Sequence, residues 1–163
     1  GPGGPMVPPG KYSVKLTAGG QTVTRTFDVK SDPRVATDGV SDAAIAEQVK
    51  FQLQVRDAIS DARKLQQQIE QAMQKAGVKP VPPLPPSQSP AGVKYDHPLQ
   101  EIWARVATSP GIYTQGMLVD QLNNIQRMVT QADQKIGKDA YDRYSDLIKE
   151  LAAVEAQLKK LGS

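Results

Sequence analysis

The chain has 163 residues, no cysteine, one histidine and one tryptophan, and only 5% of its residues are aromatic. This length allows one ordinary domain with a real core, and the low aromatic content favours a bundle of Ala-, Leu-, Ile- and Gln-rich helices over a β-sandwich. The lack of cysteine excludes disulfides, thiolate chemistry and Cys-ligated zinc within this chain.

The net charge of +3 is not concentrated in one binding face, because the helical segments are neutral and mixed in sign. Residues 41–77 carry five basic and five acidic groups, and residues 111–163 carry seven of each. A phosphate-binding stripe requires clustered Lys and Arg, so we expect no nucleic-acid partner. No apolar run approaches the roughly 20 residues that cross a bilayer, so we also expect no membrane insertion.

The N-terminal part predicts a Gly/Pro-rich lead-in over residues 1–10 and a β-hairpin over residues 11–30. Apolar residues alternate with polar ones on both sides of Gly19-Gly20, a pair typical of a tight hairpin turn. Two strands alone are marginal in water. We therefore expect the hairpin to pack on helices, to pair with a second copy, or to be the last two strands of a sheet that lies upstream. The apolar positions expected to mediate this association are Tyr12, Val14, Leu16, Val23, Phe27 and Val29.

A long helix is predicted after the breaker Ser31-Asp32-Pro33, with Ser41 as N-cap and Gly77 as the residue that ends it. One broad apolar stripe follows its 3.6-residue period. A second set, Ile45, Val49 and Leu53, falls on nearly the opposite side. We expect the hairpin to cover that second set. The main stripe comprises Phe51, Val55, Ala58, Ile59, Ala62, Leu65, Ile69, Ala72, Met73 and Ala76.

Prolines dominate the next segment, and residues 78–96 are expected to form a connector rather than a helix. Its PxxP pattern, Pro82-Pro83-Leu84-Pro85, permits recognition by an aromatic groove, but a stiff connector is the preferred interpretation. A short helix is then predicted from Pro98 and stops at Ser109-Pro110-Gly111; its apolar residues Leu99, Ile102, Trp103 and Val106 follow helical spacing.

Two further helices are predicted, one capped by Thr114 and ended by Gly137, the other starting near Asp139. Their apolar residues recur in steps of four and three, which is the pattern of a seam between helices, and the short connection requires antiparallel neighbours. Residues 41–161 are thus expected to form a mainly α fold, an antiparallel up-and-down bundle of three to four helices. The third helix offers Leu118, Leu122, Ile125, Val129, Ala132 and Ile136, and the fourth offers Leu147, Leu151, Val154, Leu158 and Leu161.

The residues with chemical potential favour structural roles. His97, between Asp96 and Pro98, is better placed to cap a helix than to act as a base. The acidic group Asp139, Asp142, Asp146 and Glu150 is interpreted as a solvated face at a helix start rather than a calcium site or glycosidase pair. No catalytic, cofactor-binding or metal-binding residue is predicted.

Trp103 has two possible roles. It is expected to be a core anchor that plugs one end of the bundle. The alternative is a groove for glycan or peptide shared with Tyr113, Tyr141 and Tyr144.

One stretch of the chain resembles a known family. The residues Pro8-Pro9-Gly10-Lys11-Tyr12-Ser13-Val14-Lys15-Leu16, Gly19-Gly20-Gln21, Phe27-Asp28-Val29-Lys30 and Asp32-Pro33-Arg34-Val35 are similar to a join in bacterial sortilin-like, BNR-repeat β-propeller proteins, often labelled glycosyl hydrolase-like. The resemblance covers about 25 residues specifically, and the order of the helices more loosely.

The resemblance implies that the hairpin is the terminal strand pair of an immunoglobulin-like sandwich and that the helices form the tail behind it. It also implies an exported, extracytoplasmic protein. It carries over no active-site residue, because none of the propeller positions lies in this chain. The proline-rich stretch at residues 78–90 departs from the family pattern.

The combined expectation is a non-catalytic structural or protein-interaction module at the C-terminus of a larger exported protein. Its partners would be other domains of the parent protein or a second copy of itself. The residues expected to pack or interact are Trp103, Leu118, Leu122, Ile125, Val129, Leu147, Leu151 and Leu158. The alternative function is an accessory domain that binds glycan or peptide in the Trp/Tyr groove. No cofactor is expected in either case.

Overall fold

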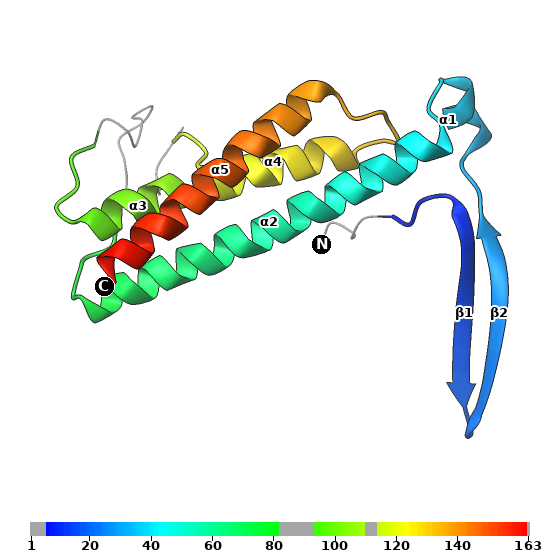
Figure 1. Ribbon diagram of the computed structural model, residues 1–163, viewed down its shortest axis with the longest axis horizontal. Coiled ribbons are helices and arrows are strands. Elements are labelled where there is room, and N and C mark those ends of the chain that lie inside the picture. Colours follow the sequence, from blue (N-terminus) through cyan, green and yellow to red (C-terminus); the bar gives the residue numbers. More distant parts are fainter. Residues whose placement is uncertain (1–5, 82–92, 110–113, 163) are drawn as a thin grey trace. The chain divides into compact units, whose positions relative to one another are not determined.

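The computed structural model describes residues 6–81, 93–109 and 114–162. It is mostly helical with an N-terminal two-stranded hairpin, which confirms the coarse fold prediction (Figure 1). The strands are β1 (Gly10–Ala18) and β2 (Gln21–Val29), and the helices are α1 (Pro33–Thr37), α2 (Asp42–Lys75), α3 (Pro98–Val106), α4 (Leu118–Thr130) and α5 (Lys138–Leu161). The predicted proline-rich connector, with its PxxP pattern, lies mostly outside the described residues, as do Tyr113 and Pro110-Gly111.

The chain divides into two compact units. The first comprises Gly1–Leu53 and Val129–Gly137, and the second comprises Gln54–Met128 and Lys138–Ser163. Within the first unit, β1 and β2 pair antiparallel through a two-residue turn at Gly19 and Gly20. Both glycines have positive φ, 56° and 76°, which matches the twist of a tight hairpin and strains any other residue type.

The helix α1 was not predicted, because Ser31-Asp32-Pro33 was interpreted only as a breaker. The same residues start a helix. The Asp32 carboxylate accepts a hydrogen bond from the Arg34 backbone N–H at 2.9 Å, and Pro33 takes the first helical position, where a missing N–H costs nothing. Arg34 then forms an ion pair with Asp32.

The helix α2 begins and ends as the sequence predicts. The Ser41 hydroxyl accepts from the Ala44 N–H at 3.2 Å, and the Ser41 carbonyl accepts from the Ile45 N–H at 3.0 Å. At the other end Gly77 has φ 66°, and the Val78 N–H donates to the Met73 carbonyl at 2.9 Å. This pattern satisfies the last carbonyls of the helix.

The helix α4 is shorter than predicted at both ends. Thr114 does not cap it; instead Met117 precedes the first helical residue, and the Thr108 hydroxyl accepts from the Met117 N–H at 2.9 Å and donates to Asp120. At the far end the helix stops at Thr130, so Ala132 and Ile136 do not extend the seam; Ala132 is exposed and Ile136 half-buried.

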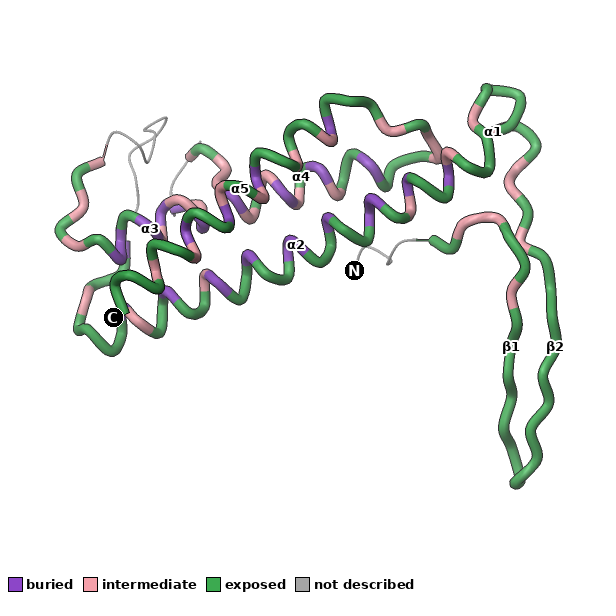
Figure 2. The backbone as a smooth tube through the Cα atoms, in the orientation of Figure 1, coloured by how far each residue is buried: buried purple, intermediate pink, exposed green. Residues whose placement is uncertain are grey.

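The core of the second unit is built from the predicted apolar stripes. Figure 2 shows buried positions recurring along α2 with helical spacing. Ala76 is exposed and Ala72 only half-buried, so the α2 stripe fades in the last turn. On α5, Leu158 is half-buried and Leu161 is 45% exposed, so the last two predicted seam positions are covered less than the others. The buried members from all three stripes include Val55, Ala62, Leu65, Ile69, Met73, Leu118, Leu122, Ile125, Leu147, Leu151 and Val154.

Polar contacts tie the helices of the second unit to one another. Arg105 on α3 forms an ion pair with Glu150 on α5 at 2.6 Å and also donates to Gln157 at 2.6 Å. The Tyr144 hydroxyl on α5 donates to the Gln54 carbonyl on α2 at 3.3 Å. None of the helices in the described ranges is long and apolar enough to cross a membrane.

Candidate association surface on the hairpin

The hairpin presents one apolar face on which most side chains are exposed. Cross-strand pairing places Tyr12 opposite Phe27, Val14 opposite Arg25, and Leu16 opposite Val23. Directly opposed residues point to the same face of a sheet. The exposed fractions are 54% for Val14, 67% for Leu16, 48% for Val23 and 49% for Phe27. We call this the apolar hairpin face, with Tyr12, Val14, Leu16, Val23, Arg25 and Phe27 as its members.

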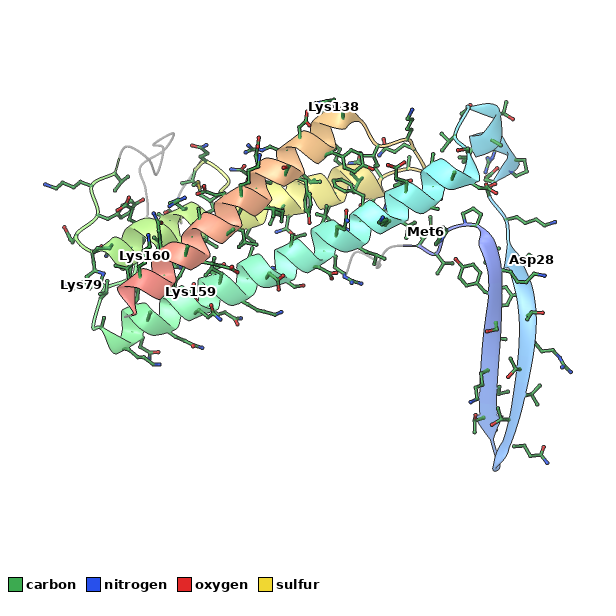
Figure 3. All side chains as sticks on the ribbon, viewed as in Figure 1. Met6, Asp28, Lys79, Lys138, Lys159 and Lys160 are labelled. Atoms are coloured by element: carbon green, nitrogen blue, oxygen red, sulfur yellow. The ribbon has the colours of Figure 1, made fainter. Side chains whose placement is uncertain are left out.

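The other face of the hairpin is polar. Lys11 lies opposite Asp28, and Lys15 lies opposite Thr24. The Thr17 and Thr22 hydroxyls form a hydrogen bond at 3.0 Å across the strands. Figure 3 draws the side chains along both strands, with Asp28 labelled on β2. One apolar and one hydrophilic face is the pattern of an antiparallel sheet that covers a core on one side only.

The hairpin also carries the net charge of the whole chain. Residues 10–30 contain four basic residues, Lys11, Lys15, Arg25 and Lys30, and one acidic residue, Asp28. The remaining residues therefore comprise 16 basic and 16 acidic groups, because the chain has 20 and 17 in total. The surplus of +3 belongs to the hairpin alone.

Tyr12 ties the start of β1 to the segment before it. Its hydroxyl donates to the Pro8 carbonyl, four residues upstream, at 2.6 Å. Its ring lies 6.1 Å from the ring of Phe27, within the range of a favourable aromatic pair. A tyrosine at the start of a strand that bonds back to upstream backbone occurs at a characteristic corner of immunoglobulin-like sandwiches.

The prediction that the hairpin covers Ile45, Val49 and Leu53 was wrong for most of the hairpin. Of the predicted association residues, only Val29 lines the same hollow as Ile45 and Val49, and Leu53 is not among the lining residues. The N-terminal residues Met6, Val7 and Pro9 line this hollow of about 780 Å³, which Figure 3 helps to locate through the label on Met6. Met6 and Val7 stay exposed, so the lead-in is an incomplete cover.

A buried amide cluster lies beside that hollow and was not anticipated. The Gln48 Nε2 donates to the carbonyls of Val129 and Ala132, each at 2.7 Å, and its Oε1 accepts from the Gln134 N–H at 3.1 Å. Gln52 Nε2 donates to the Val129 carbonyl at 2.6 Å. Two glutamines at i and i+4 on the helix side that carries Ile45 and Val49 were the available signal.

Trp103 is not the fully buried plug that was expected. It is half-buried, and its indole N–H donates to Glu70 on α2 at 3.0 Å in an exposed hydrogen bond. Its neighbours Ile102 and Val106 are buried instead.

Two of the residues of the predicted Trp/Tyr groove, Trp103 and Tyr144, lie far apart. Tyr144 bonds to Gln54, which lies 16 residues from Glu70 along α2, or about 24 Å at the rise of an α-helix. Trp103 and Tyr144 therefore do not share one groove.

His97 occupies the predicted capping position. Its Nδ1 accepts from the Leu99 N–H at 3.1 Å, and Pro98 is the first helical residue of α3. The acidic group of α5 is diluted by cations, since Asp142 pairs with Lys138 and Asp146 with Lys149. In the part of the chain that the structure describes, no three His, Cys, Asp or Glu side chains gather closely enough to hold a metal ion.

No family model, curated protein or solved structure matches the chain.

Proposed function

We propose that this chain is a non-catalytic structural and protein-interaction module, in which the helices form an antiparallel bundle and the hairpin joins a neighbouring sheet. The observation that carries the proposal is the apolar hairpin face, which stays exposed while the helical seam is buried within the chain. A module that associated through its helices would expose apolar residues there instead.

The contacts within the second unit support the bundle. Tyr144 meets Gln54, while Gln157, later on α5, lines a hollow together with Pro98 and Ile102 of α3. Trp103 of α3 in turn meets Glu70, later on α2. The helices α2 and α5 therefore run in the same direction, and α3 and α4 bring the chain back from the end of α2 to the start of α5. This is an up-down-up arrangement.

Two observations support completion of a sheet by the hairpin. Two nine-residue strands offer unpaired backbone groups on both edges, which isolated sheets rarely tolerate. The Tyr12 hydroxyl to Pro8 carbonyl bond is the tie expected near the end of an immunoglobulin-like sandwich. Together with the resemblance to sortilin-like proteins, they support the proposal that the hairpin is the last strand pair of such a sandwich in a larger, exported parent protein.

Hydrogen exchange tests this proposal. In the isolated chain, backbone amides of β1 and β2 should exchange rapidly, since a two-stranded sheet is marginal. In the full-length gene product the same amides should be protected at least about 100-fold more strongly. Amides of α2 between Phe51 and Ile69 serve as the control and should change little. Equal protection of the strands in both samples would contradict completion of a sheet.

A further inference from the structure

Arg25 places a positive charge in the middle of the apolar hairpin face. It lies directly opposite Val14 and, along β2, between Val23 and Phe27, which share its face. Any surface that covers these three apolar residues also covers the base of the Arg25 side chain. The inference that follows rests on the proposed function, because it asks what kind of surface completes the sheet.

The hairpin offers Arg25 no acidic partner of its own. Its hydrogen bond to the Thr24 carbonyl is long, at 3.5 Å. Asp28, the single acidic residue of the hairpin, lies opposite Lys11 on the other face. Burying a guanidinium without a carboxylate partner has a large desolvation cost, which opposes association. The covering surface must therefore supply the negative charge.

A second copy of this chain does not meet that requirement. Two apolar hairpin faces placed together would bring two Arg25 side chains and no carboxylate into one contact. Each hairpin also carries a net charge of +3, and like charges repel across a contact. The charge pattern therefore opposes pairing between copies.

We infer that the apolar hairpin face is covered by a different polypeptide segment, an apolar β-strand surface that places an Asp or Glu against Arg25. The cations Lys11, Lys15 and Lys30 favour an acidic border around that segment. An anionic lipid surface would also suit the charge, but it offers no ladder of backbone partners to the unpaired edges of two nine-residue strands.

Site-specific photo-crosslinking in cells that make the full-length gene product tests this inference. A benzophenone amino acid replaces Val14, on the apolar hairpin face, or Thr24, on the polar face as the matched control. We expect the probe at position 14 to form an adduct with a β-strand segment that has Asp or Glu within two residues of the crosslink. This segment should not be residues 10–30 of a second copy. The control probe should give at least about tenfold less of this adduct.

Substitution of Arg25 supplies the second readout. Arg25→Glu should lower the adduct yield by about tenfold or more, whereas Arg25→Lys should keep most of it. When Arg25→Glu is combined with a change of the mapped partner carboxylate to Lys, the opposite charges face each other again and the yield should be restored. The inference is overturned if the adduct forms with lipid or with a second copy. It is also overturned if the adduct forms with a strand but its yield is unchanged by Arg25→Glu. If a strand adduct forms regardless of charge, sheet completion stands and only the acidic partner is wrong. If no adduct forms, both fail.

Discussion

At the scale of single residues, Gln48 explains why α4 stops where it does. Its amide nitrogen donates to the Val129 carbonyl in the last turn of α4 and to the Ala132 carbonyl just beyond the helix, and its oxygen accepts from the Gln134 N–H. Side-chain bonds to the carbonyls of Val129 and Ala132 replace the helical bonds that residues further along would have made. The apolar spacing of Ala132 and Ile136 gave no sign of this competition.

Replacing Gln48 with Ala should therefore destabilise the protein. The change removes the side-chain hydrogen bonds to the Ala132 carbonyl and the Gln134 N–H, both part-buried, and each lost bond costs about 0.5–1.5 kcal/mol. Urea denaturation followed by circular dichroism measures the loss. Gln67→Ala, an exposed glutamine on the same helix, is the control and should change stability by less than about 0.5 kcal/mol. Equal midpoints for the two variants would remove the role assigned to Gln48.

Tyr144 should make stability depend on alkaline pH. Burial, followed by the nearby carboxylates of Asp57 and Asp61, raises the pKa of Tyr144 above its ordinary value of 10.0. A group whose pKa is higher in the folded state contributes stability that is complete below the unfolded pKa and is lost as pH rises through the folded pKa. The difference in the free energy of unfolding between wild type and Tyr144→Phe should thus be constant from pH 7 to 9. Above about pH 10 the wild type should lose stability relative to Tyr144→Phe. A difference that does not vary with pH up to 11 would contradict this.

At the scale of elements, sequence reasoning succeeded where one local signal acted alone. Gly19-Gly20 between alternating strands predicted the hairpin and its turn, and Ser41 and Gly77 predicted the ends of α2. It failed where contacts distant in sequence decide the outcome. The Thr108 hydroxyl, nine residues upstream, holds the start of α4, and Glu70, 33 residues away, draws the Trp103 indole toward the surface.

The association surface was predictable as a set of residues, but its exposure was not. Period-two alternation identified Tyr12, Val14 and Leu16 as one face. Whether a face is covered depends on which other segments of the chain can pack against it. The hollow beside Ile45 is lined by Met6, Val7 and Pro9 of the N-terminal segment, whereas Val29 is the one strand residue in its lining. The apolar spacing of the hairpin and of α2 does not determine which segment packs beside Ile45.

The seam of α5 yields a prediction at this scale. Leu151 is 7% exposed and Leu161 is 45% exposed on the same helix. Leu151→Ala should lower the free energy of unfolding by about 2–5 kcal/mol, because it removes buried methyl groups and leaves a cavity. Leu161→Ala should cost less than about 1 kcal/mol. Thermal melts of the two variants make the comparison, and a Leu151→Ala melt that matches the parent would contradict the assigned seam.

At the scale of the whole molecule, the uncovered hairpin raises the question of self-association. An incomplete sheet with an apolar face commonly aggregates through its edges. Here the two copies would each bring a charge of +3 to the contact. The expected result is a single species of 17.6 kDa in sedimentation equilibrium at about 0.05 M salt, where the Debye length exceeds 10 Å. A dimer of constant affinity from low to high salt would show that charge does not control pairing.

The confinement of net charge to one small segment also governs how the molecule moves in an electric field. Residues 31–163 carry equal numbers of basic and acidic groups, so a protease that cut after Lys30 would release a product with almost no electrophoretic mobility at neutral pH. The released peptide would migrate toward the cathode with the entire surplus. In the intact chain, long-range attraction to a polyanion originates from those few side chains, which makes the hairpin the first part of the molecule to be drawn in.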